Sequence, residues 1–163
     1  MDFDLGRTYD VVTCLFSAIA IVETFERLEC AIRCMARHVR PGGALIIEPW
    51  FTPQQWHPGR PFTLVGGVGG DKVYRTSVSI KERHRSVLLH HYLRVRPYAI
   101  EHYDERIELG LFTRDEMTWA HEFSGMQAQY ESEGLMGRGL YIGRHAAEVG
   151  LEFGGIRMMQ SKQ

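Results

Sequence analysis

The sequence has few cysteines, no long apolar run and no signal segment. Its 163 residues include three cysteines, an odd number that suits reduced thiols better than a disulfide framework. The most apolar run, residues 11–22, contains Thr13, Cys14 and Ser17 and is too short to span a bilayer. The first residues form neither the basic start nor the apolar stretch of a secretory signal. We therefore expect a cytoplasmic protein with no membrane segment.

An excess of charge of either sign is also absent. There are 19 lysines and arginines and 20 aspartates and glutamates, which gives a formal net charge of -1. A balanced charge provides no electrostatic attraction to nucleic acid or to an anionic membrane. Hydrophobic residues make up 44% of the chain, enough for the core of one domain. We expect no nucleic-acid partner and leave a small or nucleotide-sized ligand open.

The most informative segment is residues 38–51. Residues 41–43, Pro-Gly-Gly, predict the end of a helix, because proline disfavours a helical residue before it and glycine adopts the left-handed angles of a helix cap. Residues 44–47 are apolar and predict a buried strand of a parallel sheet. Glu48 and Trp50 then follow the carboxyl end of this strand, where ligands bind in open α/β sheets.

A strand, a short exit loop and a helix are predicted before this segment. Residues 9–16 are β-branched and aromatic, which predicts a first buried strand. Residues 23–39 follow the helical period. A right-handed crossover places the ends of both strands on one edge of the sheet. We therefore expect Phe16 and Ser17 to lie near Glu48.

The middle of the chain predicts a loop followed by antiparallel strands. Residues 52–70 are rich in proline and glycine, which predicts a lid or crossing loop without regular structure. Residues 72–81, 86–95 and 100–111 alternate between apolar and polar side chains, which predicts a meander with one solvated face.

The last elements are a short helix and two strands. Residues 113–116, Thr-Arg-Asp-Glu, form a capping-box pattern that predicts the start of a helix ending near Phe123. Residues 127–132 and 139–144 then predict two more strands.

Several of these segments, in this order and spacing, carry a resemblance to a known family. The matching segments are residues 2–7, residues 11–19, residues 41–50, Leu111-Phe112-Thr113-Arg114 and Gly137-Arg138-Gly139-Leu140. Together they resemble the S-adenosylmethionine-dependent methyltransferases that N,N-dimethylate dTDP-linked amino sugars of the desosamine and mycaminose type in macrolide antibiotic pathways. Glu48-Pro49-Trp50 and the late Gly-Arg-Gly-Leu are the specific parts.

The family's glycine-rich cofactor loop, and the acidic residue that follows it, have no match in this chain. Residues 66–70, Gly-Gly-Val-Gly-Gly, do not follow a buried strand or open a helix, so they are a poor match to such a loop. The resemblance implies that the chain is a truncated form, with roughly the C-terminal two thirds of such an enzyme and Met1 falling after the family's first two strands.

The fold implied by the resemblance is α/β, the later part of a Rossmann-like class I methyltransferase sheet with an antiparallel β insertion over the active site. Four regions are expected: a partial Rossmann core at 1–51, a lid loop and β insertion at 52–111, a helix and strand pair completing the core at 112–144, and a tail at 145–163.

The resemblance also implies a cofactor, S-adenosyl-L-methionine, and a catalytic carboxylate. Asp2 and Phe3 match the end of the adenine-binding turn, while Phe16 and Ser17 match a strand end that approaches the cofactor. Glu48 is expected beside the amine, where it either stabilises the positive charge or helps to take the proton. A structural hydrogen bond is the alternative role for this carboxylate.

Substrate contacts are expected from three residues. Arg138, between two glycines, suits bidentate contact with the diphosphate of the substrate, and Arg75 is a second diphosphate candidate. Trp50 is expected to form an aromatic wall, with core packing as the alternative. Where relatives carry His or Tyr, this chain has Ile21, which weakens the case for polar assistance from that loop.

No metal site is expected. Cys30, Cys34 and His38 share one face of the predicted helix, but ligands on three successive turns span about 12 Å, too far to meet one ion. Four more histidines lie around the meander, where a polar face is the preferred interpretation over a metal cluster: His84, His90, His91 and His102.

The expected partner is a nucleotide-linked amino sugar, with a homodimer possible. Two alternatives stay open. One is a non-catalytic remnant or nucleotide-sugar-binding module that lacks cofactor binding. The other is a methyltransferase for another small-molecule acceptor, because acceptor identity depends on loops rather than on the fold.

Overall fold

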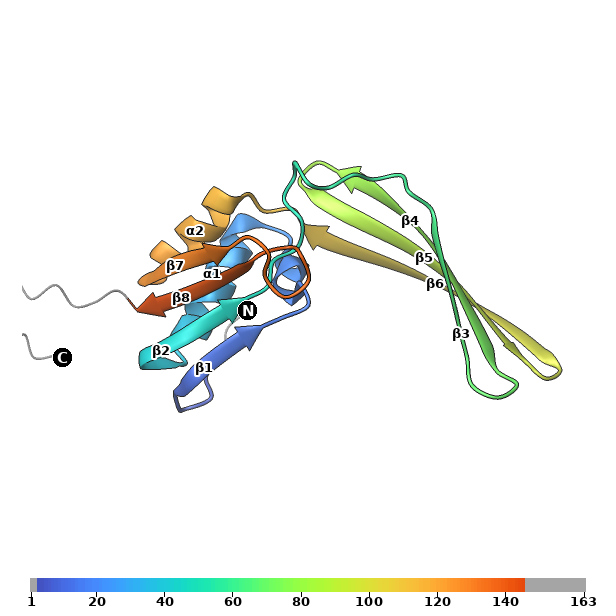
Figure 1. The fold of residues 1–163 in the computed structure, drawn as a ribbon, viewed down its shortest axis with the longest axis horizontal. Helices are drawn as coiled ribbons and strands as arrows, with labels where there is room; N and C mark the ends of the chain where they lie inside the picture. Colours follow the sequence, from blue (N-terminus) through green and yellow to red (C-terminus); the bar gives the residue numbers. More distant parts are fainter. Residues whose placement is uncertain (1–2, 146–163) are drawn as a thin grey trace, which may run out of the picture.

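The computed structural model describes residues 3–145, which form two four-stranded sheets and two α-helices. One sheet, in the order β1-β2-β8-β7, carries the helices and forms the body of the molecule (Figure 1). The other, in the order β3-β4-β5-β6, projects away from the body and is called the arm (Figure 1). Within the described part of the chain, no helix has the length and apolarity to cross a membrane.

The first half of the body is a strand-helix-strand unit. β1 (Tyr9–Cys14) leads through a short 3-10 helix, η1 (Ala18–Val22), into α1 (Phe25–Ala36) and then β2 (Val39–Ile47). β1 and β2 are parallel, as the sequence predicts. The exit loop predicted after the first strand contains the η1 turn instead of being irregular throughout.

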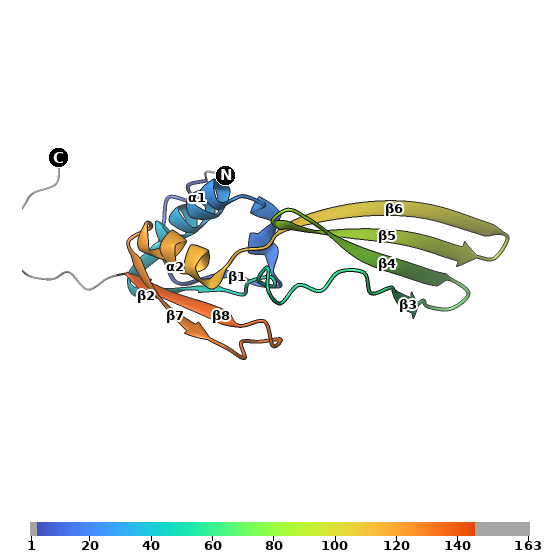
Figure 2. The same cartoon turned by 90° about the horizontal axis from the view of Figure 1, so that it is seen from above.

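The second half of the body adds α2 (Arg114–Glu122), β7 (Met126–Glu131) and β8 (Leu140–His145). β8 runs antiparallel to both β2 and β7, and both helices cover the same face of the sheet (Figure 2). The predicted capping box is confirmed, because the Thr113 hydroxyl accepts from the Glu116 amide at 3.1 Å and the Glu116 carboxylate accepts from the Thr113 amide at 2.7 Å.

The core lies between the helices and the sheet. Apolar side chains from one face of each helix pack on the buried side of β2 and β8, and burying a side chain of this size stabilises the fold by about 1.5–3 kcal/mol. The fully buried apolar residues include Leu28, Ile32, Leu45, Ile47, Met117, Met126 and Tyr141.

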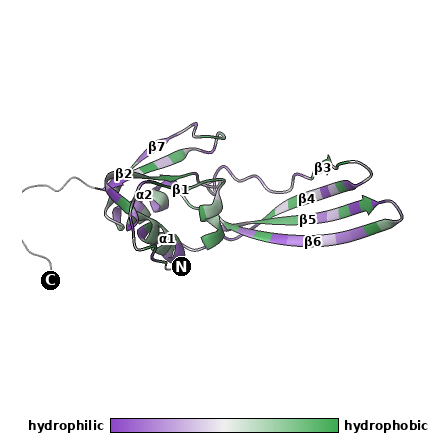
Figure 3. Ribbon diagram, turned by 90° about the horizontal axis from the view of Figure 1, so that it is seen from below, coloured by the Kyte–Doolittle hydropathy of each residue, from purple (hydrophilic) through white to green (hydrophobic). Residues whose placement is uncertain are grey.

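The arm consists of β3 (Phe62–Gly66), β4 (Lys72–Glu82), β5 (Arg85–Arg96) and β6 (Ala99–Gly110), all antiparallel. The predicted antiparallel meander is therefore confirmed. Its single solvated face is not, since apolar side chains on both faces of the outer arm are exposed, for example Val78 and Leu93 on one face and Leu64 on the other. Figure 3 shows hydrophobic segments continuing along the arm, where no described element covers them.

The role predicted for Pro41-Gly42-Gly43 is wrong. α1 ends at Ala36, and the three residues lie inside β2, where the register with β1 shifts between Tyr9 and Val11. Gly42 has a left-handed φ of 77°, and a Cβ at Gly43 would lie 2.6 Å from the Asp10 carbonyl oxygen. Gly43 therefore permits close approach of β1 and β2, and Gly42 supplies the left-handed turn of the backbone, instead of the pair capping the helix.

Two further strand predictions need correction. β1 was expected to be buried, but it pairs only with β2 among the described strands, and Val11 is 49% exposed. The loop expected over residues 52–70 contains β3, which adds to the edge of β4 with Leu64 opposite Arg75. β3 lies between a proline and a run of glycines, so its own sequence gives little indication of a strand. Its pairing with β4 specifies the strand instead.

Candidate functional site

The candidate site lies at the edge of the body sheet where the two parallel strands end. Glu48 directly follows β2, and its amide donates to the carbonyl of Cys14, the last residue of β1, at 2.9 Å. This confirms that the exits of both strands lie side by side, as the crossover argument predicts.

The Glu48 side chain is fully buried, and both of its carboxylate oxygens have protein partners. Oε2 accepts from the Phe16 amide at 2.7 Å, and Oε1 accepts from Nη2 of Arg138 at 3.2 Å. A buried carboxylate is stabilised by such donors. Glu48 therefore connects the exit of β1 to the segment between β7 and β8.

The exit turn of β1 has an unusual backbone. Phe16 and Ser17 have φ of 54° and 59°, in the left-handed region that non-glycine residues rarely adopt. Each such residue costs of order 1–3 kcal/mol, so the surrounding structure must hold the turn in place. Glu48 accepts from the Phe16 amide, and the buried Ser17 hydroxyl donates to the Pro49 carbonyl at 2.8 Å. Phe16 is left 76% exposed.

Arg138 reaches the site from the turn before β8. Its flanking glycines, Gly137 and Gly139, have left-handed φ of 73° and 89°, and a Cβ at Gly139 would overlap the ring of Tyr130. The Arg138 guanidinium carbon lies 5.5 Å from the centre of the Trp50 ring, and its buried Nε has no hydrogen-bond partner within residues 3–145. One donor of Arg138 is therefore unused within the described residues, and the side chain as a whole is 17% exposed.

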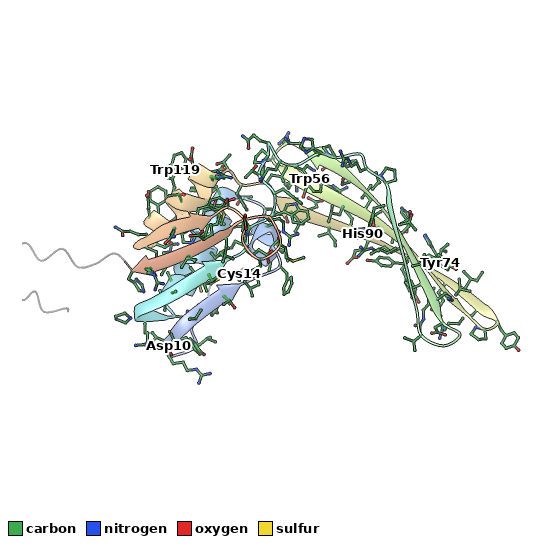
Figure 4. The ribbon with its side chains drawn as sticks, viewed as in Figure 1. Asp10, Cys14, Trp56, Tyr74, His90 and Trp119 are labelled. Carbon is green, nitrogen blue, oxygen red and sulfur yellow. The ribbon has the colours of Figure 1, made fainter. Side chains whose placement is uncertain are left out.

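Three aromatic rings form a wall, of which Trp50 lies beside Arg138. Trp50 lies 4.7 Å from Phe51 and 5.5 Å from Trp56, measured between ring centres, and Trp50 Nε1 donates to the Ser86 hydroxyl at the base of the arm at 2.8 Å. Trp56, which Figure 4 shows at the base of the arm, is not among the residues expected from the sequence. Its segment has no periodicity, so the only signal was a third large ring within seven residues.

The structure does not bring Arg75 together with Arg138. Arg75 pairs with Tyr92, six positions along β5 from Ser86, which corresponds to roughly 20 Å at 3.4 Å per residue. Figure 4 shows the adjacent Tyr74 far out on the arm. The Nε of Arg75 is buried without a partner among the residues described, but this arginine is not part of the Arg138 site within one chain.

Phe3 also lies apart from the other cofactor candidates. Its ring stacks on His38 at 4.9 Å, and its amide lies 3.3 Å from the Cys34 sulfur, near the end of α1. The His38 ring accepts from the Leu5 amide through Nε2 and donates to the Cys34 carbonyl through Nδ1, which is a structural role for this histidine. Asp2 lies outside the described residues.

The glycine-rich segment at 66–70 belongs to the arm. It joins β3 to β4, so it closes a hairpin and does not connect a buried strand to a helix. This agrees with the poor match to a cofactor loop that its sequence context indicates. Gly67 shows why glycine is needed there, since any Cβ would overlap the backbone of Asp71.

The chain is similar in sequence and in fold to known proteins. No family model matches the chain. It is 39% identical over 142 residues to a dTDP-4-amino-2,3,4,6-tetradeoxy-D-glucose N,N-dimethyltransferase of Saccharopolyspora spinosa, covering 87% of this chain and 57% of that protein. It is 34% identical over 148 residues to a dTDP-3-amino-3,6-dideoxy-alpha-D-glucopyranose N,N-dimethyltransferase of Streptomyces fradiae, covering 90% of this chain and 58% of that protein.

A solved structure shares the fold. The crystal structure of DesVI from Streptomyces venezuelae matches with a TM-score of 0.84 at 31% identity, over 89% of this chain and 62% of DesVI. The chain thus spans about three fifths of the length of the proteins it matches. Over most of its own length, the chain is homologous to the dTDP-amino sugar N,N-dimethyltransferases.

Proposed function

We propose that this chain is part of an S-adenosylmethionine-dependent N-methyltransferase that acts on the amino group of a dTDP-linked amino sugar in antibiotic biosynthesis. One observation carries the proposal: Arg138, with an unpaired donor, lies beside an aromatic wall at the edge where β1 and β2 end. The activity is that in the names of the homologous N,N-dimethyltransferases.

The proposed cofactor is S-adenosyl-L-methionine, which supplies an activated methyl group on a sulfonium. The residues present fit one side of such a cofactor, because the exit turn of β1 is held in a fixed left-handed shape and exposes the Phe16 ring. Phe16 and Ser17 would line the cofactor there. The cofactor roles of Asp2 and Phe3 stay predictions, and the contacts of Phe3 near the end of α1 give no support to its role.

For the substrate, Arg138 would bind the diphosphate, since a guanidinium suits bidentate contact with phosphate oxygens. Trp50 would form the wall against the sugar or base. Holding a neutral amine in line with the methyl group supplies most of the rate acceleration, so little acid-base chemistry is required from the protein.

The catalytic role of Glu48 stays a prediction. Its contacts support a role in positioning the neighbouring groups instead. Because the Phe16 amide and Arg138 engage its two oxygens, Glu48 is placed to orient the Arg138 guanidinium and the exit turn. We propose that Glu48 is a positioning residue whose negative charge also favours the positively charged product amine.

The placement of the arm over the site is likewise a proposal. Its base contacts the site through the Trp50–Ser86 hydrogen bond, and Arg85 at this base donates to Glu23 of the body at 3.1 Å. Arg75 lies on the arm, well away from Arg138. Any anionic group that it binds would therefore differ from the group bound by Arg138. A homodimer is supported by the apolar side chains exposed on one face of the arm: Val65, Tyr74, Val78, Leu93 and Ile100.

A second candidate function is a nucleotide-sugar-binding module without cofactor binding. It is favoured by the absence, within residues 3–145, of a glycine-rich loop between a buried strand and a helix. Acceptor identity is also open, because the relatives' names place the amino group at C4 of the sugar in one and at C3 in another. A cytoplasmic location is proposed from the three free cysteines.

The test is a calorimetric titration of the purified chain with S-adenosylhomocysteine and, separately, with dTDP, followed by a methyl-transfer assay on dTDP-amino sugars. Micromolar binding of both compounds and transfer of a methyl group support the proposed enzyme. Binding of dTDP alone supports the binding module. Binding of neither compound contradicts both functions.

A further inference from the structure

Three polar side chains that the proposed function does not use converge on one face of the arm. His91 on β5 lies directly opposite Asp104 on β6, and His102 is two residues before Asp104 on the same strand. Side chains two residues apart on a strand point to the same face, and directly opposite side chains have Cβ atoms about 5 Å apart. The backbone ladder therefore sets this cluster, whereas the adjacent His90 points to the opposite face.

The ligand atoms of the cluster have separations suited to a small cation. Nδ1 of His91 is 3.4 Å from Nε2 of His102, which is 3.1 Å from Oδ1 of Asp104. In a tetrahedral site with bonds of about 2.0–2.1 Å, ligand atoms are roughly 3.3 Å apart. The third separation, 2.5 Å between His91 Nδ1 and Asp104 Oδ1, is an ion-pair contact that a small rotation of the exposed Asp104 side chain would widen.

The surroundings leave these atoms available. All three residues are exposed, and the histidine rings stack with their centres 5.6 Å apart and an angle of 11° between them. In the described part of the chain, the three side chains bond one another and no fourth side chain. Two imidazole nitrogens and one carboxylate leave a further coordination position open to water.

We propose that His91, His102 and Asp104 form a zinc-binding site that ties β5 to β6 in the middle of the arm. Imidazole nitrogens favour Zn²⁺ and neighbouring transition metals over Mg²⁺ and Ca²⁺, which prefer sets of oxygen ligands. The site lies outside the Glu48–Arg138 site and does not depend on the proposed function. It departs from the absence of a metal site expected from the sequence, because the sequence does not reveal the register that places Asp104 opposite His91.

The test is a titration of the tag-free chain with Zn²⁺ by calorimetry and with Co²⁺ by visible absorption. We expect one ion per chain, a dissociation constant in roughly the micromolar range and a Co²⁺ spectrum typical of nitrogen and oxygen ligands. His91→Ala and Asp104→Asn should each weaken binding by at least about tenfold, because each removes one of only three protein ligands.

His57→Ala is the matched control, since His57 is an exposed histidine outside the cluster, hydrogen-bonded to its own loop through the Gln55 carbonyl. It should bind Zn²⁺ as the wild type does. Circular dichroism checks that the variants remain folded, which the exposure of all three substituted positions favours. Retention of full affinity in either cluster variant, an equal loss in His57→Ala, or no saturable binding below about 1 mM would each overturn the proposal.

Discussion

The Glu48 carboxylate lies 3.2 Å from the Arg138 guanidinium, although the two residues are 90 positions apart in the sequence. The carboxylate is fully buried, and the arginine side chain is only 17% exposed. The pair joins the end of β2 to the turn before β8, and the Phe16 amide adds the exit of β1 to the same carboxylate. One side chain therefore fixes three segments of the candidate site.

Replacing Glu48 with glutamine should destabilise the fold by about 2–3 kcal/mol, because the amide then presents a donor to Phe16 or to Arg138 and leaves a largely buried cation without its counter-charge. Urea unfolding at pH 7.5 measures the effect. Glu29→Gln is the control, since Glu29 pairs with Arg33 on the surface of α1 at 2.8 Å. Equal small effects for the two variants would contradict the structural role of Glu48.

Glycine at position 16 should give a more stable protein than alanine by about 1 kcal/mol, because the φ of 54° penalises any residue with a Cβ. The comparison of Phe16→Gly with Phe16→Ala by thermal unfolding measures this. At the helical Arg33, the order should be reversed, with alanine more stable than glycine by about 1 kcal/mol. If alanine is more stable than glycine at position 16, as it is at position 33, the exit turn is not left-handed.

The two glycines beside Arg138 should respond differently to alanine. Gly137→Ala meets no atom within 4 Å and should cost only the left-handed strain, about 1–2 kcal/mol. Gly139→Ala must also displace the Tyr130 ring and should cost about 3 kcal/mol or more. Chemical unfolding of the two variants measures the free energy of unfolding that each one loses. Similar losses would indicate that Gly139 does not pack against Tyr130 as described.

Burial lowers the pKa of His121 below its ordinary 6.5, and the ring stacks on Tyr141 at 5.7 Å. Below pH 6.5, the unfolded chain therefore binds more protons than the folded chain at this site, so stability falls as the pH drops from 6.5 towards the lowered pKa. The slope contributed by one such group is at most about 1.4 kcal/mol per pH unit.

His121→Phe should therefore reduce the loss of melting temperature between pH 7.5 and pH 5.5, whatever its effect on stability at pH 7.5. Part of the loss should remain, because the pKa of His90 is also lowered by burial. His57→Gln serves as the control, as this residue is exposed. An unchanged pH dependence in His121→Phe would contradict the buried neutral state of His121.

The sequence was most informative where local pattern and local structure coincide. The helical period of α1, the capping box at Thr113 and the alternation of β4 to β6 each reflect interactions close in the chain. The helix, its cap and the three strands were therefore predicted, although α1 is shorter than the expected residues 23–39 and the single solvated face of the arm was not confirmed. The adjacency of Phe16 and Glu48 also followed from the sequence, because crossover handedness is a general rule.

Features that depend on distant pairing were not predictable. The Glu48–Arg138 contact, the addition of β3 to β4 and the His91–Asp104 register are all set by strand pairing, which single-sequence patterns do not specify. Pro41-Gly42-Gly43 was misinterpreted for a related reason. The need for glycine at position 43 comes from the Asp10 carbonyl on another strand, not from the preceding helix.

The most direct test of the account is the affinity of the chain for dTDP in Arg138→Ala, Arg138→Lys and the control Arg33→Ala, measured by calorimetry. We expect Arg33→Ala to bind as the wild type does and Arg138→Ala to bind at least about tenfold more weakly. Arg138→Lys, which keeps the counter-charge of Glu48 but loses the planar fork, should be folded and intermediate in affinity. Unchanged dTDP affinity in a folded Arg138→Lys and in Arg138→Ala would contradict the assignment of Arg138 to a nucleotide-sugar site.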